Sequence, residues 1–164
     1  MRSSLRFAGA PPRRYAGKIM TIIEAIKESW SWSGIEPEEV VGENDFGNLM
    51  IRDIHGRYWR LCPEDVYCRV IAESRKELDA LSQNQEFLAD WYMTALTEQA
   101  KDKFGPLKQG RKYHLAIPGV LGGEYGIANI RTVPQIELIR FSGDIGRQIN
   151  ELPDGAKVKL VIDE

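Results

Sequence analysis

The stretch LMIRDIHGRYWRL, residues 49–61, contains two short segments of strand type that meet at a turn. Its β-branched, aromatic and aliphatic residues are typical of strands, and Gly56 is typical of the turn between them. Trp59 and Leu61 are two residues apart, so their side chains share one face of a strand. We therefore predict a β-hairpin with strands at 49–53 and 57–61, and we build the rest of the fold around it.

Three segments outside the hairpin have the caps and the apolar spacing of helices. Thr21 with Glu24, and Ser74 with Glu77, form capping-box patterns in which each side chain can bond the other residue's backbone N–H. A longer apolar stripe follows Asn84, which is a good N-cap residue. We expect helices at 22–30, 75–82 and 85–104, the last ended by a Gly-Pro pair.

From Tyr113 onwards, apolar and polar residues alternate as they do in strands. Ile145 and Ile149 instead have helical spacing, which predicts a short helix over 142–152, with Asp144 near its start as a cap or helix-dipole partner. The strands that we expect in this part of the chain are 113–117, 127–133, 135–141 and 157–162, with Pro134 between the second and third.

These elements predict a single domain of the α+β class, with a mostly antiparallel sheet packed against several helices. We assign the domain to residues 20–164. Residues 1–19 hold five of the 22 basic residues and none of the 24 acidic ones, and they show no periodicity. We expect them to be a disordered basic arm, and Met20 is a possible alternative start.

The composition fits one soluble globular domain, since 43% of the 164 residues are hydrophobic and 28% are charged. Charged residues interrupt each apolar run before it reaches the roughly 20 residues that a membrane span needs, so we expect no membrane contact. Cys62 and Cys68 are the only cysteines, and no secretory signal pattern is present. We therefore expect a cytoplasmic protein without a structural disulfide.

Negative charge is concentrated in residues 34–45, which contain no basic residue. This acidic segment is either a solvated, mobile loop or a patch that attracts a basic partner, such as a DNA-binding toxin. The same acidity argues against direct nucleic-acid binding. The candidate partner-binding acids are Glu36, Glu38, Glu39, Glu43 and Asp45.

Two tryptophans, Trp30 and Trp32, lie where the first predicted helix ends beside the acidic segment. Large aromatic side chains at such a position are typical anchors of protein interfaces. The alternative is that both rings pack at the edge of the hydrophobic core. We include both as candidate partner-binding residues.

The sequence contains no pattern that is typical of an active site. The possible metal ligands do not have the spacing of a zinc motif: His55, Cys62, Cys68 and His114. No serine lies in a nucleophile elbow. We therefore predict no catalytic residue, no metal and no cofactor.

A glycine-rich segment, residues 119–124, follows a predicted strand without matching a phosphate-binding motif. It lacks the Lys-Ser/Thr pair of a P-loop, and its acidic residue would repel a phosphate. We interpret it as a tight turn or as a partner-contact loop. The candidate contact residues here are Gly122, Gly123, Glu124 and Tyr125.

Several short sequence blocks, most of them between residues 46 and 152, have the pattern of a known family. The most specific is IPGVLGGEY at 117–125. The others include GNL at 47–49, GRYWR at 56–60, PE at 63–64, FLADW at 87–91, GPL at 105–107, FSGDI at 141–145 and LPDG at 152–155. Together they resemble the C-terminal domain of immunity proteins that are paired with type VI secretion DNase effectors.

The resemblance implies a bacterial immunity protein that binds a cognate secreted effector, a basic DNase, and occludes it in a stoichiometric complex. It implies no catalytic residue. Members often carry a preceding glutamate-rich GAD-like module, for which residues 21–45 are too short. Two alternatives stay open from the residues themselves: a regulatory module that binds an endogenous protein, and a small metal-dependent enzyme.

Overall fold

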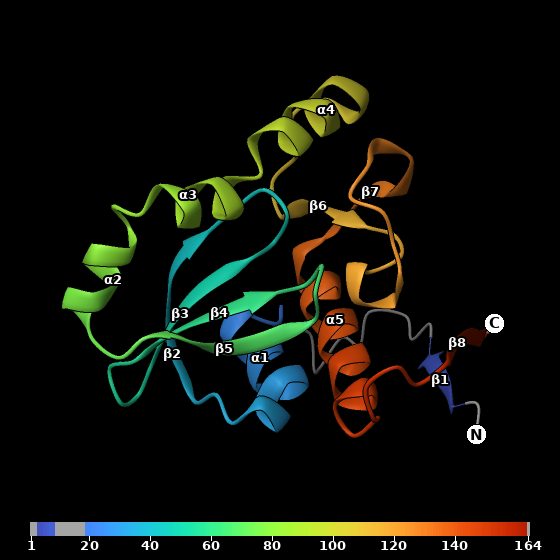
Figure 1. Ribbon diagram of the computed structural model, residues 1–164, viewed down its shortest axis with the longest axis horizontal. Coiled ribbons are helices and arrows are strands. Elements are labelled where there is room, and N and C mark those ends of the chain that lie inside the picture. Colours follow the sequence, from blue (N-terminus) through green and yellow to red (C-terminus); the bar gives the residue numbers. More distant parts are fainter. Residues whose placement is uncertain (1–2, 9–18, 164) are drawn as a thin grey trace.

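A four-stranded antiparallel sheet forms the centre of the fold (Figure 1). The computed structural model describes residues 3–8 and 19–163, and here the sheet has the order β2-β3-β4-β5. Its strands are Pro37–Glu43, Leu49–Asp53, Tyr58–Cys62 and Tyr67–Ala72. β3 and β4 form the predicted hairpin, with Ile51 opposite Trp59, so this prediction is confirmed. β5 lies where we predicted no strand.

Asp53 closes the turn of this hairpin. Its carboxylate accepts hydrogen bonds from the indole N–H of Trp59 at 2.8 Å and from Nε of Arg57 at 2.9 Å. It also accepts the backbone N–H groups of His55 and Arg57. Burial acts to raise the pKa of Asp53, but these hydrogen bonds outweigh it and hold the pKa below its ordinary value. The Asp53 carboxylate at the centre of the turn is therefore fully hydrogen-bonded.

The acidic segment contains an edge strand, so our expectation of a mobile loop was wrong. β2 pairs with β3, with bulges between Pro37 and Glu39 and between Val40 and Gly42. Val40 packs against the core, and the flanking carboxylates lie at the surface. Dense charge and bulges are typical of edge strands, because both hinder unwanted pairing with another strand.

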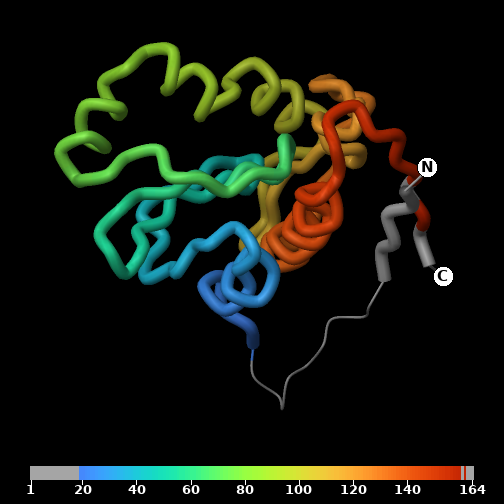
Figure 2. The backbone as a smooth tube through the Cα atoms, turned by 60° about the horizontal axis from the view of Figure 1, so that its bottom comes forward, coloured from blue at the N-terminus to red at the C-terminus, as the bar shows by residue number. Residues whose placement is uncertain are grey.

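Two helices cover one face of the sheet, namely α1 (Ile22–Trp30) and α5 (Gln135–Asn150) (Figure 2). The capping box at the start of α1 is confirmed, with both reciprocal bonds present. Trp30 donates its indole N–H to the carbonyl of Ile139 at 2.9 Å within the core. The buried side chains of this layer are Ala25, Ile26, Trp30, Ile35, Leu49, Ile51, Trp59, Leu61, Val66, Cys68, Ile139 and Ile145.

α5 is longer than we predicted, and the strand expected at 135–141 was wrong. The apolar residues of this run satisfy a helical spacing as well as an alternating one, since Leu138 and Ile139 continue the buried face that contains Ile145. Asp144 consequently lies inside the helix and not at its start. It accepts hydrogen bonds from Arg147 at 2.6 Å and from Gln148 at 3.0 Å, so it is not a cap.

The helices α2 (Arg75–Leu81), α3 (Gln85–Tyr92) and α4 (Thr94–Phe104) lie on the other side of the sheet (Figure 2). The cap at Asn84 is confirmed, since its side chain accepts the N–H of Phe87 at 2.9 Å. The single helix predicted over 85–104 is broken at Met93, which has the left-handed φ of 43°. This break lets Trp91 pack on the main sheet while Ala100 joins a separate core cluster.

A second sheet pairs β6 (Arg111–Leu115) with β7 (Ile130–Pro134). It packs with α4 around a cluster that contains the buried Phe46 and Tyr113. The strands predicted at 113–117 and 127–133 are thus confirmed with shifted ends. The short 3₁₀ helices of the chain are η1 (Ser31–Ser33), η2 (Gly119–Leu121) and η3 (Ile127–Asn129).

A parallel pair of strands joins β1 (Ser3–Ala8) and β8 (Val158–Asp163). β8 confirms the last predicted strand. β1 differs from the disordered arm that we expected at 1–19, because its partner lies more than 150 residues away and local sequence does not reveal it. Residues 1, 2 and 9–18 lie outside the described part of the chain. The helices and the mostly antiparallel sheets confirm the α+β class.

Within residues 3–8 and 19–163, no helix is long and apolar enough to cross a membrane.

α1 and α5 cross at a glycine, which sets how closely they approach. A Cβ atom on Gly143 would lie 2.5 Å from the carbonyl oxygen of Ser29. We predict that Gly143→Ala lowers the free energy of unfolding by about 1–3 kcal/mol, because the two helix backbones must separate. Urea unfolding measures this difference.

Gly126→Ala is the matched control, because a Cβ atom there meets no atom within 4 Å and its φ is −146°. Its free energy of unfolding should stay near that of the wild type. Equal stability of the two variants would contradict the close crossing of the helices.

Candidate functional site

The acidic residues of the 34–45 segment are all paired within the chain. Glu36 is hydrogen-bonded to His55, and ion pairs join Glu38 and Glu39 to Arg52, Glu43 to Lys112, and Asp45 to Lys101, with nitrogen–oxygen distances of 3.1–3.3 Å. The bases come from the neighbouring strand β3, the β3–β4 turn, α4 and β6. This surface therefore carries alternating charge, and its net negative charge is smaller than the sequence suggests.

The paired acids nonetheless remain accessible, because the side chains of Glu38 and Glu39 are 52% and 57% exposed. Exposed ion pairs of this kind contribute little to stability. The basic side chains of a partner could replace Arg52 as the ion-pair partner of Glu38 and Glu39. The acidic strand β2 can therefore still contribute to recognition.

The two candidate tryptophans serve mainly the core. Trp30 is fully buried, and its ring stacks on that of Trp32 at 5.3 Å. Trp32 is half-buried and donates its indole N–H to the carbonyls of Ser29 and Gly143 at the α1–α5 crossing. The ring of Trp30 is therefore not available at the surface, and Trp32 presents only part of its own.

Residues 117–125, which we call the apolar loop, form a tightly closed structure between β6 and η3. Asn129 closes it, since its side chain accepts the N–H of Ile117 at 2.9 Å and donates to the carbonyls of Ile117 and Glu124. Gly123 lies so close that a Cβ atom there would be 1.7 Å from the carbonyl oxygen of Ile117. The candidate glycines are thus required by the turn, which confirms the tight-turn interpretation.

The apolar loop is also fastened to the turn between β4 and β5. The N–H of Gly119 donates to the carbonyl of Glu64 at 2.7 Å, and the hydroxyl of Tyr125 donates to the carboxylate of Asp65 at 2.7 Å. A Cβ atom on Gly119 would lie 2.8 Å from the Tyr125 ring. The loop is therefore held in place before any partner arrives.

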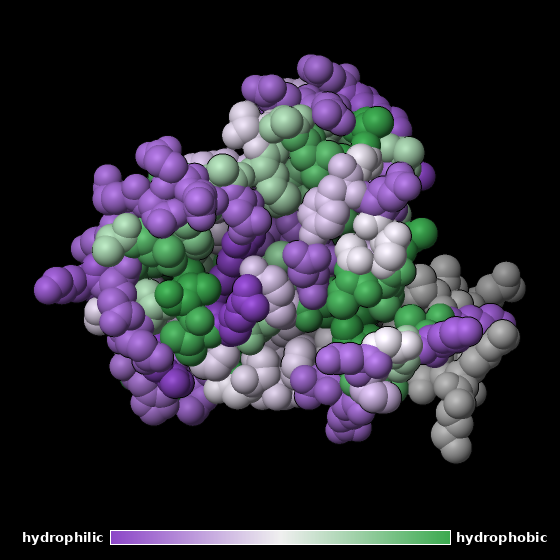
Figure 3. Space-filling model, viewed as in Figure 1, coloured by the Kyte–Doolittle hydropathy of each residue, from purple (hydrophilic) through white to green (hydrophobic). Residues whose placement is uncertain are grey.

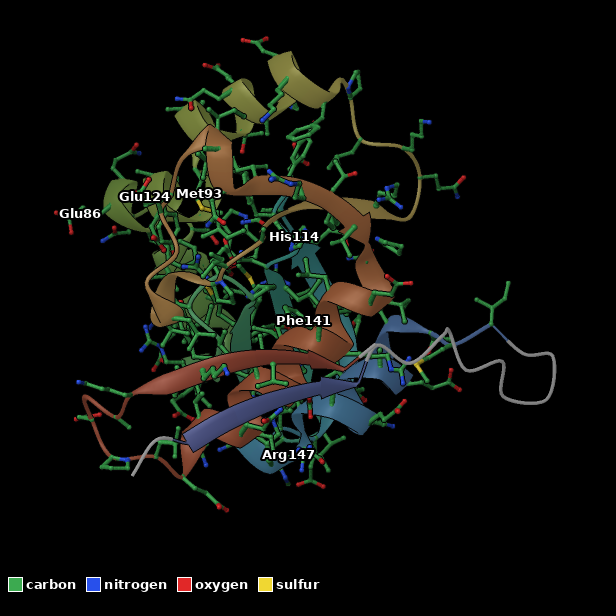
Figure 4. All side chains as sticks on the ribbon, turned by 90° about the vertical axis from the view of Figure 1, so that its right-hand side faces the viewer. Glu86, Met93, His114, Glu124, Phe141 and Arg147 are labelled. Carbon is green, nitrogen blue, oxygen red and sulfur yellow. The ribbon has the colours of Figure 1, made fainter. Side chains whose placement is uncertain are left out.

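Three large apolar side chains of this rigid loop face solvent. Ile117, Val120 and Tyr125 are 45%, 48% and 48% exposed. Figure 3 shows apolar side chains gathered on the surface over η2. Glu124 is exposed beside them and lies at the edge of the molecule in Figure 4. A preorganised apolar surface with an adjacent carboxylate is suited to binding another protein.

A buried polar network supports the β4–β5 turn from below. Asn48 donates from Nδ2 to both carboxyl oxygens of Glu64 at 2.8 Å and accepts from Nε of Arg60 at 3.0 Å. Arg60 also pairs with Asp90 of α3 and lies over the ring of Trp91. The network thus connects β4, the β4–β5 turn and α3.

Burial raises the pKa of Glu64, although the hydrogen bond from Asn48 and the charge of Arg60 act in the opposite direction. Glu64 lines a narrow pocket together with His114 and Phe141, both labelled in Figure 4. Burial also lowers the pKa of His114. The same pocket is lined by Pro118 of the apolar loop, so these groups lie next to the loop.

The possible metal ligands do not gather at one place. His55 lies in the β3–β4 turn beside Glu36, and His114 lies on β6. Cys62 and Cys68 are free and buried, and burial raises the pKa of each thiol, that of Cys68 to about 12. The described residues contain no group of three or more His, Cys, Asp or Glu side chains that could hold a metal ion.

Sequence reasoning found the glycines and Tyr125 of the apolar loop but missed the other two apolar side chains that it exposes, Ile117 and Val120. The sequence placed Ile117 in a strand and Val120 in the glycine-rich segment, and only the fold shows that both side chains are exposed. The buried network left a better signal, because Asn48, Glu64 and Asp90 each lie in a block that carried the family resemblance.

Residues 72–146, just under half of the chain, match the family model described as type VI secretion system (T6SS) immunity protein Tdi1, C-terminal. The match spans α2 to α4, the second sheet, the apolar loop and most of α5. It confirms the resemblance that we read from the sequence and supports a role in effector neutralisation. No curated protein matches the chain.

The raised pKa of Glu64 predicts a pH dependence of stability. The folded state binds the Glu64 proton more tightly than the unfolded chain, whose glutamate has a pKa near 4.5. The free energy of unfolding therefore falls as pH rises from about 4.5 through the raised value. We predict that the stability of the wild type relative to Glu64→Gln decreases over this range, measured by urea unfolding.

The comparison with Glu64→Gln removes the contribution of the other carboxyl groups, because both proteins share them. A stability difference that stays constant between pH 4 and pH 8 would show that Glu64 keeps its ordinary pKa. Asp144→Asn is a second control, which removes one carboxyl group from the partly exposed side of α5. It should leave the pH dependence that is due to Glu64 in place.

Proposed function

We infer that this protein is an immunity protein that binds a cognate secreted antibacterial effector in the cytoplasm and neutralises it in a one-to-one complex. The effector is a DNase, and the immunity protein acts without catalysis, by covering the nuclease active site. The match to an immunity-protein domain supports the class of function. The DNase target and the mode of inhibition are the finer parts of the proposal.

The observation that carries the proposal is the exposed, preorganised apolar loop within the matched region. Its three exposed apolar side chains are held by the closure at Asn129 and the contacts to the β4–β5 turn. Little conformational entropy is lost when such a rigid surface binds, so more of the contact energy appears as affinity. An inhibitor that must capture a toxin quickly and hold it benefits from this rigidity.

The acidic strand supports a basic target. A nuclease needs positive charge to hold DNA, and the exposed carboxylates of Glu38 and Glu39 complement such a surface. Charge complementarity mainly raises the association rate, while the apolar contact slows dissociation. The two surfaces would thus contribute to different steps of binding.

Co-expression in bacteria with the product of a neighbouring toxin gene tests the function. We predict that the wild type restores growth and co-purifies with the toxin, whereas Val120→Asp lowers the affinity at least tenfold, because it places a charge in the apolar contact. Survival and isothermal titration calorimetry measure the two effects.

Tyr92→Asp is the matched control, because Tyr92 is 58% exposed on α3, outside both the apolar loop and the acidic strand β2. It should protect as well as the wild type. If the wild type neither rescues growth nor binds the toxin, the proposed function is wrong and binding of an endogenous partner becomes the better hypothesis. If Val120→Asp binds like the wild type, the effector uses another surface.

The acidic strand gives a separate kinetic prediction. The double variant Glu38→Gln and Glu39→Gln should associate with the effector about two- to tenfold more slowly at low salt, with a smaller effect at high salt. Stopped-flow fluorescence measures the rate. The control pair Glu73→Gln and Glu98→Gln removes the same charge from exposed positions elsewhere. Equal rates for both pairs would exclude steering by β2.

A further inference from the structure

A groove that the proposed function does not use lies beside the connection between α4 and β6. It has a volume of about 480 Å³, and its lining residues are Phe104, Gly105, Pro106, Leu107, Lys108, Arg111 and Thr132. Phe104 is 37% exposed, and Leu107 packs partly against the cluster around Tyr113. One part of its wall is therefore apolar, and the rest is polar or charged.

The wall of this groove has a fixed shape. The hydroxyl of Tyr113 donates to the carbonyl of Gly105 at 2.6 Å, where α4 ends. At the other end of the connection, the N–H of Gln135 donates to the carbonyl of Gly110 at 2.8 Å. The connection is thus attached at both ends, which preserves the groove in the absence of a ligand.

Two cations border the apolar wall. Neither Lys108 nor Arg111 forms an ion pair with an acidic residue in the described part of the chain. Arg111 donates from Nη2 to the carbonyl and hydroxyl oxygens of Thr132 at 3.0 and 3.1 Å, which orients the guanidinium. Its Nε and Nη1 form no hydrogen bond with the described residues, so they can donate to a ligand.

We propose that this groove binds an extended segment of the effector in which an apolar side chain is flanked by carboxylates. The apolar side chain would lie against Phe104 and Leu107. The carboxylates would accept hydrogen bonds from Arg111 and Lys108, and a pre-oriented guanidinium favours such charge-assisted bonds. This inference rests on the proposed function for the identity of the partner, but the binding chemistry is independent of it.

An acidic peptide fits the groove better than a nucleic acid. Nucleic-acid affinity depends on neutralising many phosphates, and only two unpaired cations line this groove. The nearby Lys101 is already paired with Asp45, and the whole chain carries a net charge of −2. The groove therefore offers one apolar contact and one or two carboxylate contacts.

The groove and the apolar loop lie at opposite ends of β6. The groove includes Arg111, the first residue of this strand, and the apolar loop follows Leu115, its last residue. The strand is about 17 Å long by its residue count. A single effector could contact both surfaces, and a variant in one need not disturb the other.

Titration of the ¹⁵N-labelled protein with a synthetic hexapeptide of alternating leucine and glutamate tests the groove without the effector. We expect amide shifts confined to residues 104–111 and 132. Lys108→Glu should weaken binding at least fivefold, because it places a carboxylate beside the ligand's own. The same peptide with glutamine in place of glutamate should also bind more weakly.

Matched controls separate the groove from general charge and apolarity. Lys76→Glu makes the same charge change as Lys108→Glu, but at an exposed position on α2. Phe104→Ala removes the exposed ring of the groove and should weaken peptide binding. Its control is Tyr92→Ala, which removes a 58% exposed ring from α3. Both controls should bind the peptide like the wild type. Absence of shifts at millimolar peptide, or equal loss in Lys76→Glu, would overturn the proposal. So would shifts at the same residues with a thymidine 20-mer and none with the peptide.

The affinity for the effector tests whether the groove takes part in the proposed complex. If the groove holds an effector segment, Lys108→Glu should lower the affinity for the toxin at least fivefold while Lys76→Glu leaves it unchanged. An unchanged affinity in Lys108→Glu, with the complex intact, overturns the assignment of the partner and leaves the proposed function standing. Peptide binding at the groove without any toxin complex supports the groove and contradicts the proposed function.

Discussion

The buried carboxyl group of Glu64 links the core of the protein to its candidate binding surface. Its side chain accepts two hydrogen bonds from Asn48 inside the fold, while its backbone carbonyl accepts the N–H of Gly119 in the apolar loop. Removing a carboxyl group from water is costly, and the cost is offset only when its partners are held in place. The position of the apolar loop therefore depends on the same residues that satisfy this buried group.

The same network also fixes the position of α3 on the main sheet. Arg60 is buried on β4, yet it reaches Asn48 on one side and Asp90 of α3 on the other. On the opposite face of the sheet, α1 and α5 cross closely at Gly143, and an ion pair between Glu28 and Arg140 joins the same two helices. Each face of the sheet is thus held by apolar packing together with specific polar contacts, which leaves the sheet between them little freedom to shift.

The parts of the fold that sequence predicts well are those with local causes. The β3–β4 hairpin and the caps at Thr21 and Asn84 depend on residues within a few positions of one another. The parts that were missed lack an unambiguous local pattern, even where the partner strand is close in the sequence, as β3 is to β2. β2 reads as a solvated loop until β3 pairs with it, and the run after Pro134 fits a strand as well as a helix until Ile139 meets Trp30. The candidate site divides in the same way, since spacing identifies its glycines, whereas the exposure of Val120 follows only from tertiary contacts.

The two cysteines have a practical consequence for studying this protein. Both thiols are buried, and burial raises the pKa of each, so the reactive thiolate form is scarce at neutral pH. A reporter thiol placed on the surface would therefore be the dominant site of attack by maleimide or iodoacetamide. The natural chain thus provides a chemically quiet background, in which one dye on the apolar loop and another at the groove could report how far apart a bound partner holds them.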